Sequence, residues 1–176
     1  MSFNENFIKI IREDFKFTRK GHCRVVVFIF RMRSYLHQHF KIQLLRQLFK
    51  FLWNIVYFLY VMMICHCEFS KEAVIGPGLG IYHAYNILVG KCIIGKRATL
   101  GHEVTVTSGE QEGVDRITVV GDDVMFSMGC RVVGPINIGS NVNVGANAVL
   151  FHDVADNMVV LNQVIERPRK QVRASE

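Results

Sequence analysis

Residues 120–150 read VGDDVMFSMGCRVVGPINIGSNVNVGANAVL, and every sixth position of this stretch, counted from its first residue, is apolar. The same spacing occurs upstream in two shorter series, one starting at Ile75 and one at Ile94. The apolar column consists of Ile75, Ile81, Ile87, Ile94, Leu100, Val106, Val120, Phe126, Val132, Ile138, Val144 and Leu150. A period of six fits neither the 3.6-residue turn of an α-helix nor the two-residue alternation of a strand.

Two further columns accompany the first. The position after the apolar residue is glycine in six of twelve cases, namely Gly76, Gly95, Gly101, Gly121, Gly139 and Gly145. The position four steps on is small or branched in most cases (Ala98, Val104, Val124, Cys130, Ile136, Val142, Ala148 and Val154). This pattern is typical of a hexapeptide β-helix, in which each hexapeptide forms one face of a triangular coil. The apolar column points inward, glycine allows tight corners, and three hexapeptides make a coil of about eighteen residues.

The composition is that of a folded protein: half of the 176 residues are apolar and 20% are charged. The net charge is +6, and the basic residues concentrate before residue 51 and after residue 165. Basic ends of this kind are able to bind the headgroups of phospholipids or the phosphates of a cofactor. The alternative is that they simply face solvent. We expect no nucleic-acid partner, because no recognised binding motif accompanies the charge.

The cysteines predict a reducing compartment. Five cysteines, an odd number, without a secretory signal at the N-terminus indicate reduced thiols in the cytoplasm. Cys65-His66-Cys67 allows a zinc interpretation, but no second ligand pair follows at a finger-like spacing. We therefore favour buried or bystander thiols there and expect no metal.

The sequence divides into three segments. Residues 1–67 are apolar and basic, and the spacing of Phe7, Ile8, Ile11 and Phe15 predicts an amphipathic helix that ends near Gly21. Residues 25–30 fit a strand or a buried helix equally well. Residues 68–160 form the predicted β-helix, with a polar loop insertion at 107–119 where the repeat is interrupted, and residues 161–176 form a basic tail.

The segment from Phe51 to Cys65 is nearly all apolar, but its fifteen residues are too few to span a bilayer as a helix. We favour a helix buried against the β-helix end or a neighbouring subunit. The alternatives are a helix lying on the inner face of the plasma membrane, with upstream basic residues at anionic headgroups, and a short tilted span.

One histidine in the repeats has a candidate partner. His83 follows the inward-pointing Ile81, and Glu68 lies fifteen positions earlier, close to one coil of about eighteen residues. A carboxylate that holds one imidazole nitrogen leaves the other free as a general base for a hydroxyl. The alternative is a surface histidine on a regular coil.

Several motifs resemble serine acetyltransferases and related hexapeptide-repeat acyltransferases: residues 73–83 (AVIGPGLGIYH), 104–106 (VTV), 113–116 (GVDR) and 138–149 (IGSNVNVGANAV). The resemblance covers about residues 68–160. It implies a left-handed β-helix that forms a homotrimer, with active sites between neighbouring prisms and acetyl-CoA as the donor. It implies that His83 is the catalytic base, that Glu68 orients it, and that the pantetheine arm lies near Gly129 and Ala146. From charge alone, Arg167 and Lys170 in the tail are candidates for the phosphates of the cofactor.

The departures from the serine enzymes concern the acceptor. Tyr82 replaces their aspartate before the histidine, Ile117 replaces their second histidine, and Arg116 remains as a candidate carboxylate ligand. The short N-terminal segment, Glu68 and His102 look more like the acetyltransferases of colanic-acid and capsule polysaccharide assembly, with His102 as a candidate acceptor ligand. We therefore predict direct acetyl transfer to a sugar hydroxyl in capsule or exopolysaccharide synthesis. The alternatives are a serine O-acetyltransferase of cysteine biosynthesis and a non-catalytic β-helix trimer.

Overall fold

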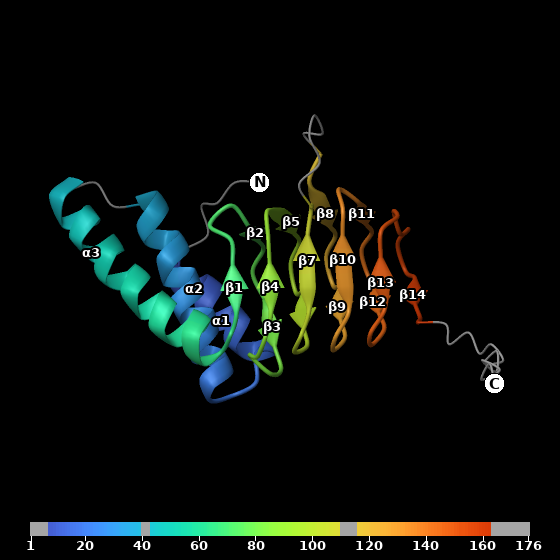
Figure 1. Ribbon diagram of the computed structural model, residues 1–176, viewed down its shortest axis with the longest axis horizontal. Coiled ribbons are helices and arrows are strands. Elements are labelled where there is room, and N and C mark those ends of the chain that lie inside the picture. Colours follow the sequence, from blue (N-terminus) through green and yellow to red (C-terminus); the bar gives the residue numbers. More distant parts are fainter. Residues whose placement is uncertain (1–6, 40–42, 110–115, 163–176) are drawn as a thin grey trace, which may run out of the picture.

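The computed structural model describes residues 7–39, 43–109 and 116–162, which form a helical part followed by a triangular β-helix (Figure 1). The helices are α1 (Phe7–Phe17), α2 (His22–His39) and α3 (Gln43–Val56), and a π-helical segment, η1 (Tyr57–Ile64), continues α3. Gly21 separates α1 from α2 with a φ of 84°, as predicted. Residues 25–30, which fitted strand or helix equally well, lie inside α2.

The strands wind into three parallel sheets, which form the faces of a prism. Face A contains β1 (Glu68–Phe69), β4 (Leu88–Val89), β7 (Thr105–Thr107), β10 (Arg131–Val133) and β13 (Val149–Leu150). Face B contains β2 (Val74–Ile75), β5 (Cys92–Ile94), β8 (Thr118–Val120) and β11 (Asn137–Ile138). Face C contains β3 (Gly80–Ile81), β6 (Thr99–Leu100), β9 (Met125–Phe126), β12 (Asn143–Val144) and β14 (Val159–Val160). The chain visits A, B and C in turn, and the fold is the predicted left-handed parallel β-helix preceded by helices.

The strand register gives the coil length. Arg131 pairs with Val149 and Asn137 with Val119, so the later coils repeat after eighteen residues as predicted. The first coil is longer, since Glu68 pairs with Leu88. The coil that contains the loop between β7 and β8 is longer still, but the strands on either side of that loop keep their places on faces A and B.

The core of the prism is the predicted apolar column. All twelve of its residues are at most 3% exposed. The glycine column allows adjacent coils to approach each other closely: a Cβ atom on Gly76 would lie 2.6 Å from the carbonyl oxygen of Gly95 in the next coil. A larger residue there would push the two coils apart.

A buried ion pair docks the helices onto the first coil. Asp14 of α1 is fully buried, and Arg31 of α2 donates its Nε–H to the Asp14 Oδ2 atom at 2.8 Å. Asp14 Oδ1 also accepts the backbone N–H groups of Gly78 and Leu79, at 2.9 and 2.8 Å. Arg31 donates to two backbone carbonyls of the same coil, each at 2.7 Å. Both charges are therefore fully hydrogen-bonded, as buried charges must be to avoid a large desolvation cost.

The apolar helix that ends near Cys65 is largely exposed. Residues Gln47–Ile64 have a mean hydropathy of 1.5, and only 11% of the segment is buried. By length and composition this is one helix that could cross a membrane. From the sequence we favoured burial against the β-helix end or against a neighbouring subunit. Packing within one chain leaves most of these apolar side chains exposed, and burial against a neighbouring subunit stays a prediction.

Candidate active site

Five of the predicted site residues lie along one edge of the prism, which we call the C–A edge because the chain turns there from face C to face A. Tyr82 and His83 follow β3, His102 follows β6, Gly129 follows β9 and Ala146 follows β12. Successive coils are about 4.8 Å apart, so the row from His83 to Ala146 is roughly 14 Å long. The structure thus assembles the predicted base and the predicted pantetheine positions on four adjacent coils.

The imidazole of His83 is exposed and has two polar neighbours. The His102 ring lies nearly perpendicular to it, with 5.8 Å between the ring centroids. The Nη1 atom of Arg19 is 3.2 Å from Nε2 of His83 and 3.4 Å from Nδ1. Arg19 is held in place because its backbone N–H donates to the carbonyl of Ile81 at 3.1 Å. Sequence reasoning missed Arg19 because it lies outside the repeat, in the turn between α1 and α2.

Glu68 lies on face A, and its backbone N–H donates to the carbonyl of Ile87 at 2.7 Å. Its register partner is Leu88, because the corner at 82–87 lengthens the first coil beyond the assumed eighteen residues. Within the described part of the chain, no hydrogen bond or ion pair joins the Glu68 carboxylate to His83. The orienting role of Glu68 stays a prediction.

Arg116 lies at a different edge, the A–B edge, where the chain turns from face A to face B. It follows the loop that leaves β7 and precedes β8, and its Nη2 atom is 3.9 Å from Oδ2 of Asp153. One copy of the chain therefore does not bring Arg116 to the edge that carries His83.

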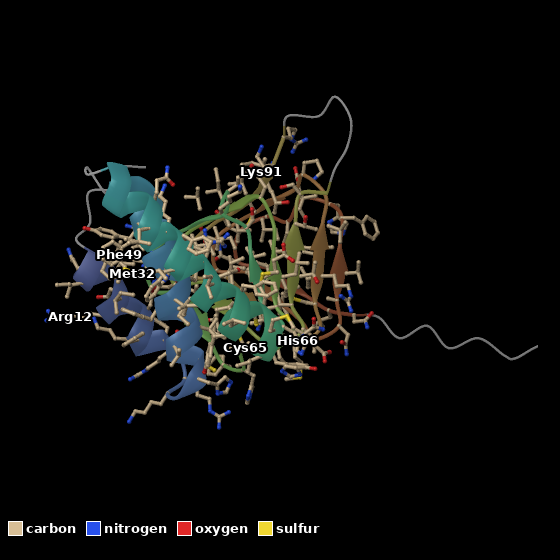
Figure 2. All side chains as sticks on the ribbon, turned by 60° about the vertical axis from the view of Figure 1, so that its left-hand side comes forward. Arg12, Met32, Phe49, Cys65, His66 and Lys91 are labelled. Atoms are coloured by element: carbon tan, nitrogen blue, oxygen red, sulfur yellow. The ribbon has the colours of Figure 1, made fainter. Side chains whose placement is uncertain are left out.

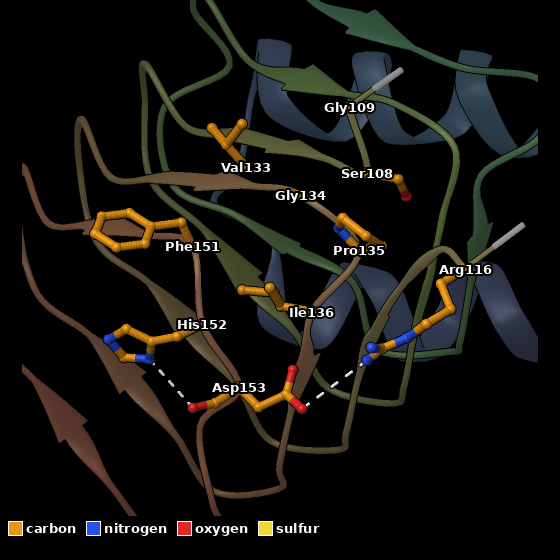
Figure 3. A pocket seen from close by; sticks show the side chains of 10 residues that line it. All are labelled: Ser108, Gly109, Arg116, Val133, Gly134, Pro135, Ile136, Phe151, His152 and Asp153. Atoms are coloured by element: carbon orange, nitrogen blue, oxygen red, sulfur yellow. Dashed lines mark hydrogen bonds and ion pairs between the residues drawn. The ribbon is translucent and has the colours of Figure 1, made fainter. Parts of the chain in front are cut away.

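A pocket of about 590 Å³ opens at the A–B edge beside Arg116 (Figure 3). Its lining combines backbone-rich turns at Gly109 and Gly134 with the side chains of Phe151, His152 and Asp153. The pKa of Asp153 lies below its usual range, mainly because its carboxylate accepts the backbone N–H of Asn137 at 2.7 Å, with a smaller contribution from Arg116. From the sequence, Arg116 and the loop at 107–119 were already candidates for a site, but Phe151, His152 and Asp153 were not, because they come from another coil and share no motif with that loop.

The thiols in the β-helix are not placed for nucleophilic chemistry. Cys92 and Cys130 are fully buried, and desolvation raises the pKa of each thiol to about 12. Cys65 and Cys67 are buried as well. Across residues 7–39, 43–109 and 116–162, no group of three or more His, Cys, Asp or Glu side chains is arranged to hold a metal ion. Arg167 and Lys170 lie outside the described residues.

Comparison with known proteins identifies relatives by sequence. No family model matches the chain. Serine acetyltransferase from Staphylococcus aureus is 38% identical over 88 residues, which cover 49% of this chain and 41% of that protein. Serine acetyltransferase from Mycobacterium tuberculosis is 38% identical over 95 residues, covering 53% of this chain and 42% of the relative. The match thus spans about two fifths of the length of these curated relatives.

The structural neighbours are also serine acetyltransferases. The enzyme from Neisseria gonorrhoeae in complex with serine superimposes with a TM-score of 0.68 and 24% identity, covering 89% of this chain and 66% of the other. A serine acetyltransferase in complex with CoA gives a TM-score of 0.68 with 20% identity, and the match covers 89% of this chain and 67% of the other. At these identities the likeness establishes the fold, namely a hexapeptide-repeat β-helix with helices before it.

The prediction of a sugar O-acetyltransferase for capsule or exopolysaccharide synthesis is wrong, because the relatives and neighbours are serine acetyltransferases. That prediction relied on the short N-terminal segment, Glu68 and His102, and on Tyr82 and Ile117, which replace polar residues of the serine enzymes. The length of a segment does not identify an acceptor, and within the described residues no hydrogen bond or ion pair links the Glu68 carboxylate to His83, so neither feature specifies the acceptor. His102 does lie beside His83, but an imidazole pairs as readily with an amino-acid hydroxyl as with a sugar hydroxyl.

Proposed function

We propose that this protein is an acetyl-CoA-dependent O-acetyltransferase and that its acceptor is the hydroxyl of serine. The observation that carries the proposal is the exposed His83 imidazole on the C–A edge, in a chain whose relatives by sequence are serine acetyltransferases. The activity is proposed for a chain that matches less than half of those relatives.

In the proposed reaction, His83 acts as a general base. Its imidazole takes the proton from the serine hydroxyl while the oxygen attacks the thioester carbonyl of acetyl-CoA. The tetrahedral intermediate then collapses, the carbon–sulfur bond breaks, and the imidazolium returns the proton to the departing CoA thiolate. No acyl-enzyme forms in this scheme, which agrees with the burial and raised pKa of the Cys92 and Cys130 thiols.

The C–A edge suits the extended arm of the donor. Gly129 and Ala146 carry no bulky side chain, so an amide-containing arm could approach the backbone along this row. Ala146 is exposed on the coil two steps beyond the His102 coil. The role of Arg167 and Lys170 at the phosphates remains part of this proposal and rests on their charge.

We infer that the working site combines two copies of the chain in a homotrimer. His83 and Arg116 occupy different edges, so they can share one acceptor only if one prism supplies the histidine and its neighbour supplies the arginine. The pocket at the A–B edge would then face the C–A edge of the adjacent prism. A heterologous contact of this kind closes into a ring with threefold symmetry.

In this arrangement the carboxylate and the ammonium group of serine each have candidate binding residues. Arg19 and Arg116 are cations able to receive its carboxylate. Tyr82 is half exposed next to His83, and its hydroxyl and ring face could receive the ammonium group. Tyr82 and Ile117 thus change how the amino acid is held in comparison with the serine enzymes that the motifs resemble.

A thiol-release assay with acetyl-CoA tests the proposal. We expect CoA release that depends on serine, and a loss of roughly 10²–10⁴-fold in kcat for His83→Ala, the usual contribution of a general base. His22→Ala, which removes an exposed imidazole from the start of α2, is the control. Undiminished serine acetylation by folded His83→Ala protein would refute the role of His83.

Acetyl-CoA binding is tested separately by thermal melting. A ligand that binds only the native state must raise the melting temperature. We expect acetyl-CoA to do so, and no shift at saturating acetyl-CoA together with no turnover would favour the non-catalytic trimer.

A further inference from the structure

The helix α3–η1 exposes a continuous apolar surface on the outside of the molecule. We call this surface the outer face; its residues are Leu48, Phe51, Leu52, Ile55, Val56, Phe58, Leu59, Met63 and Ile64, each between 40% and 64% exposed. Figure 1 shows α3 at the end of the molecule opposite β14, and Figure 2 shows it running along the surface. Contiguous apolar surfaces of this kind mark contact sites.

The opposite side of the helix is firmly attached to the protein. Trp53 donates its indole N–H to the carbonyl of Ile29 at 3.0 Å, and the hydroxyl of Tyr57 bonds the backbone of Phe69. The Arg33 guanidinium lies 4.1 Å from the centroid of the Tyr57 ring. The helix is therefore held along the molecule with its apolar side outward, in the orientation of a helix that lies on a surface.

The charge of the N-terminal residues distinguishes between two possible partners of the outer face, a second copy of the chain and a lipid bilayer. Residues 1–50 contain 11 Lys and Arg and 3 Asp and Glu, a net charge of +8, whereas the whole chain carries +6. A second copy on the outer face would bring two strongly cationic segments together, which is unfavourable. An anionic bilayer complements this charge and accepts apolar side chains beneath its headgroups.

We propose that the outer face docks onto an anionic lipid bilayer, with α3–η1 parallel to the membrane plane. The α-helical part of Gln47–Ile64, which ends at Val56, would by itself extend about 15 Å along the headgroup boundary, and η1 would continue it. The apolar chains enter the acyl region, while the basic segment strengthens binding by about fivefold for each Lys or Arg near the leaflet. This inference does not depend on acetyl transfer.

Vesicle flotation with the full chain is the direct test. We expect the protein to float with vesicles of phosphatidylcholine mixed with phosphatidylglycerol, and to bind vesicles of phosphatidylcholine alone at least tenfold less. Added salt should weaken binding to the anionic vesicles, because it screens the charges. No flotation with anionic vesicles would overturn the proposal.

A charge placed on the outer face should abolish docking. Leu52 and Leu59 are about half exposed, so the double variant Leu52→Glu/Leu59→Glu should fold, as circular dichroism would verify. We expect it to bind anionic vesicles roughly tenfold less or weaker still. The matched control is Leu161→Glu, the same chemical change at a 71% exposed leucine next to β14, which should float like the parent chain. Flotation unaffected by the double change would refute docking through this face.

A tryptophan moved to the outer face provides a second readout. Trp53 is the only tryptophan in the chain and faces the protein, so the variant Trp53→Phe/Phe51→Trp carries the indole at a 63% exposed position of the outer face instead. We expect lipids that carry a nitroxide quencher near the headgroup to quench its fluorescence in anionic vesicles, and absence of quenching would count against the proposal. If light scattering shows that the double variant has a smaller assembly than the parent, and neither binds vesicles, the outer face is an interface between copies and lipid docking is refuted.

Discussion

At the scale of single residues, the surroundings of His83 suggest a role for an arginine from another part of the chain. Arg19 contributes a guanidinium 3.2 Å from His83 Nε2, and within the described residues no carboxylate pairs with it. A cation placed beside the proposed base is suited to hold the carboxylate of the acceptor.

Arg19→Gln should therefore raise the KM for serine by about 10-fold or more, since a hydrogen bond to a charged group contributes about 1.5–3 kcal/mol. The KM for acetyl-CoA should change little. Steady-state kinetics with each substrate varied in turn would measure the two KM values. The KM of Arg19→Lys for serine should lie between those of the parent chain and Arg19→Gln. Equal effects on both substrates would indicate a merely structural role.

The buried thiols predict how stability changes in alkaline solution. Desolvation raises the pKa of Cys67 to about 11 and that of Cys92 and Cys130 to about 12. The folded state thus favours the neutral thiol, so this contribution is complete below the unfolded pKa of about 8.5 and is lost as pH rises toward the folded values.

We expect each thiol to remove about 1.4 kcal/mol from the free energy of unfolding per pH unit above its unfolded pKa. Urea denaturation between about pH 8 and 10 would measure this dependence. Cys130→Ala should show a shallower decline, because one titrating group is gone while lysines and tyrosines still contribute equally in both proteins. An identical decline would contradict the assignment.

Residues inside the repeat were predictable and residues outside it were not. The inward position of Val132 or Ile138 follows from a local period, which burial enforces in every coil. Arg19 reaches His83 only through the docking of a helix turn onto a distant coil, so no spacing in the sequence indicates that contact.

At the scale of elements, the attachment of the helices to the prism depends on the buried pair Asp14–Arg31. Removing one partner of such a pair leaves an uncompensated buried charge. Asp14→Ala should therefore lower the free energy of unfolding by about 3–5 kcal/mol, measured by chemical denaturation.

The neighbouring acid provides the control for this prediction. Glu13 pairs with Lys16 at 2.7 Å, but both side chains are substantially exposed. Glu13→Ala should cost less than about 1 kcal/mol, as is usual for exposed ion pairs. Similar losses for Asp14→Ala and Glu13→Ala would show that the buried pair does not hold the two parts together.

The helical elements were only partly predictable. The spacing of Phe7, Ile11 and Phe15 identified α1, whose bounds are Phe7–Phe17. Residues 25–30 were ambiguous because a short apolar run suits a strand or a buried helix, and packing against α1 and α3 decides for the helix. The exposure of the α3–η1 outer face depends on which side Trp53 and Tyr57 attach, and the composition of the segment does not reveal that.

At the scale of the whole molecule, the separation of His83 and Arg116 on two edges makes a prediction about mixed assemblies. If each site takes His83 from one copy and Arg116 from its neighbour, an inactive His83→Ala protein and an inactive Arg116→Ala protein complement each other. Each trimer that contains both variants should have one working site of three, so an assembly that contains both should recover about a third of the parent activity.

Coexpression of the two variants with different affinity tags, followed by purification through both tags and a thiol-release assay, would measure this recovery. His83→Ala protein that carries one tag, coexpressed with His83→Ala protein that carries the other, is the control and should stay inactive. Absence of recovery in the doubly purified assembly would indicate that each site is built from one copy.

The architecture of the whole molecule was more predictable than its acceptor. The repeat determines the prism because every coil contributes to the same pattern. The acceptor depends on a few side chains at edges that meet only in an assembly, such as Tyr82 and Arg116, and one chain's sequence does not show what faces them. This is why the fold was predicted correctly and the sugar acceptor was not.

The buried pair at the start of the prism also gives the molecule a direction of assembly. A ribosome makes the chain from its N-terminus, so Asp14 and Arg31 are synthesised before any coil. Their hydrogen bonds to the backbone of the first coil form only when that coil has been made. Each finished coil then presents unpaired backbone groups to the next. At about 5–20 residues per second, synthesis delivers one eighteen-residue coil every one to four seconds or so. The β-helix can therefore lengthen coil by coil from the end that the helices cover, because each coil pairs with the one made just before it.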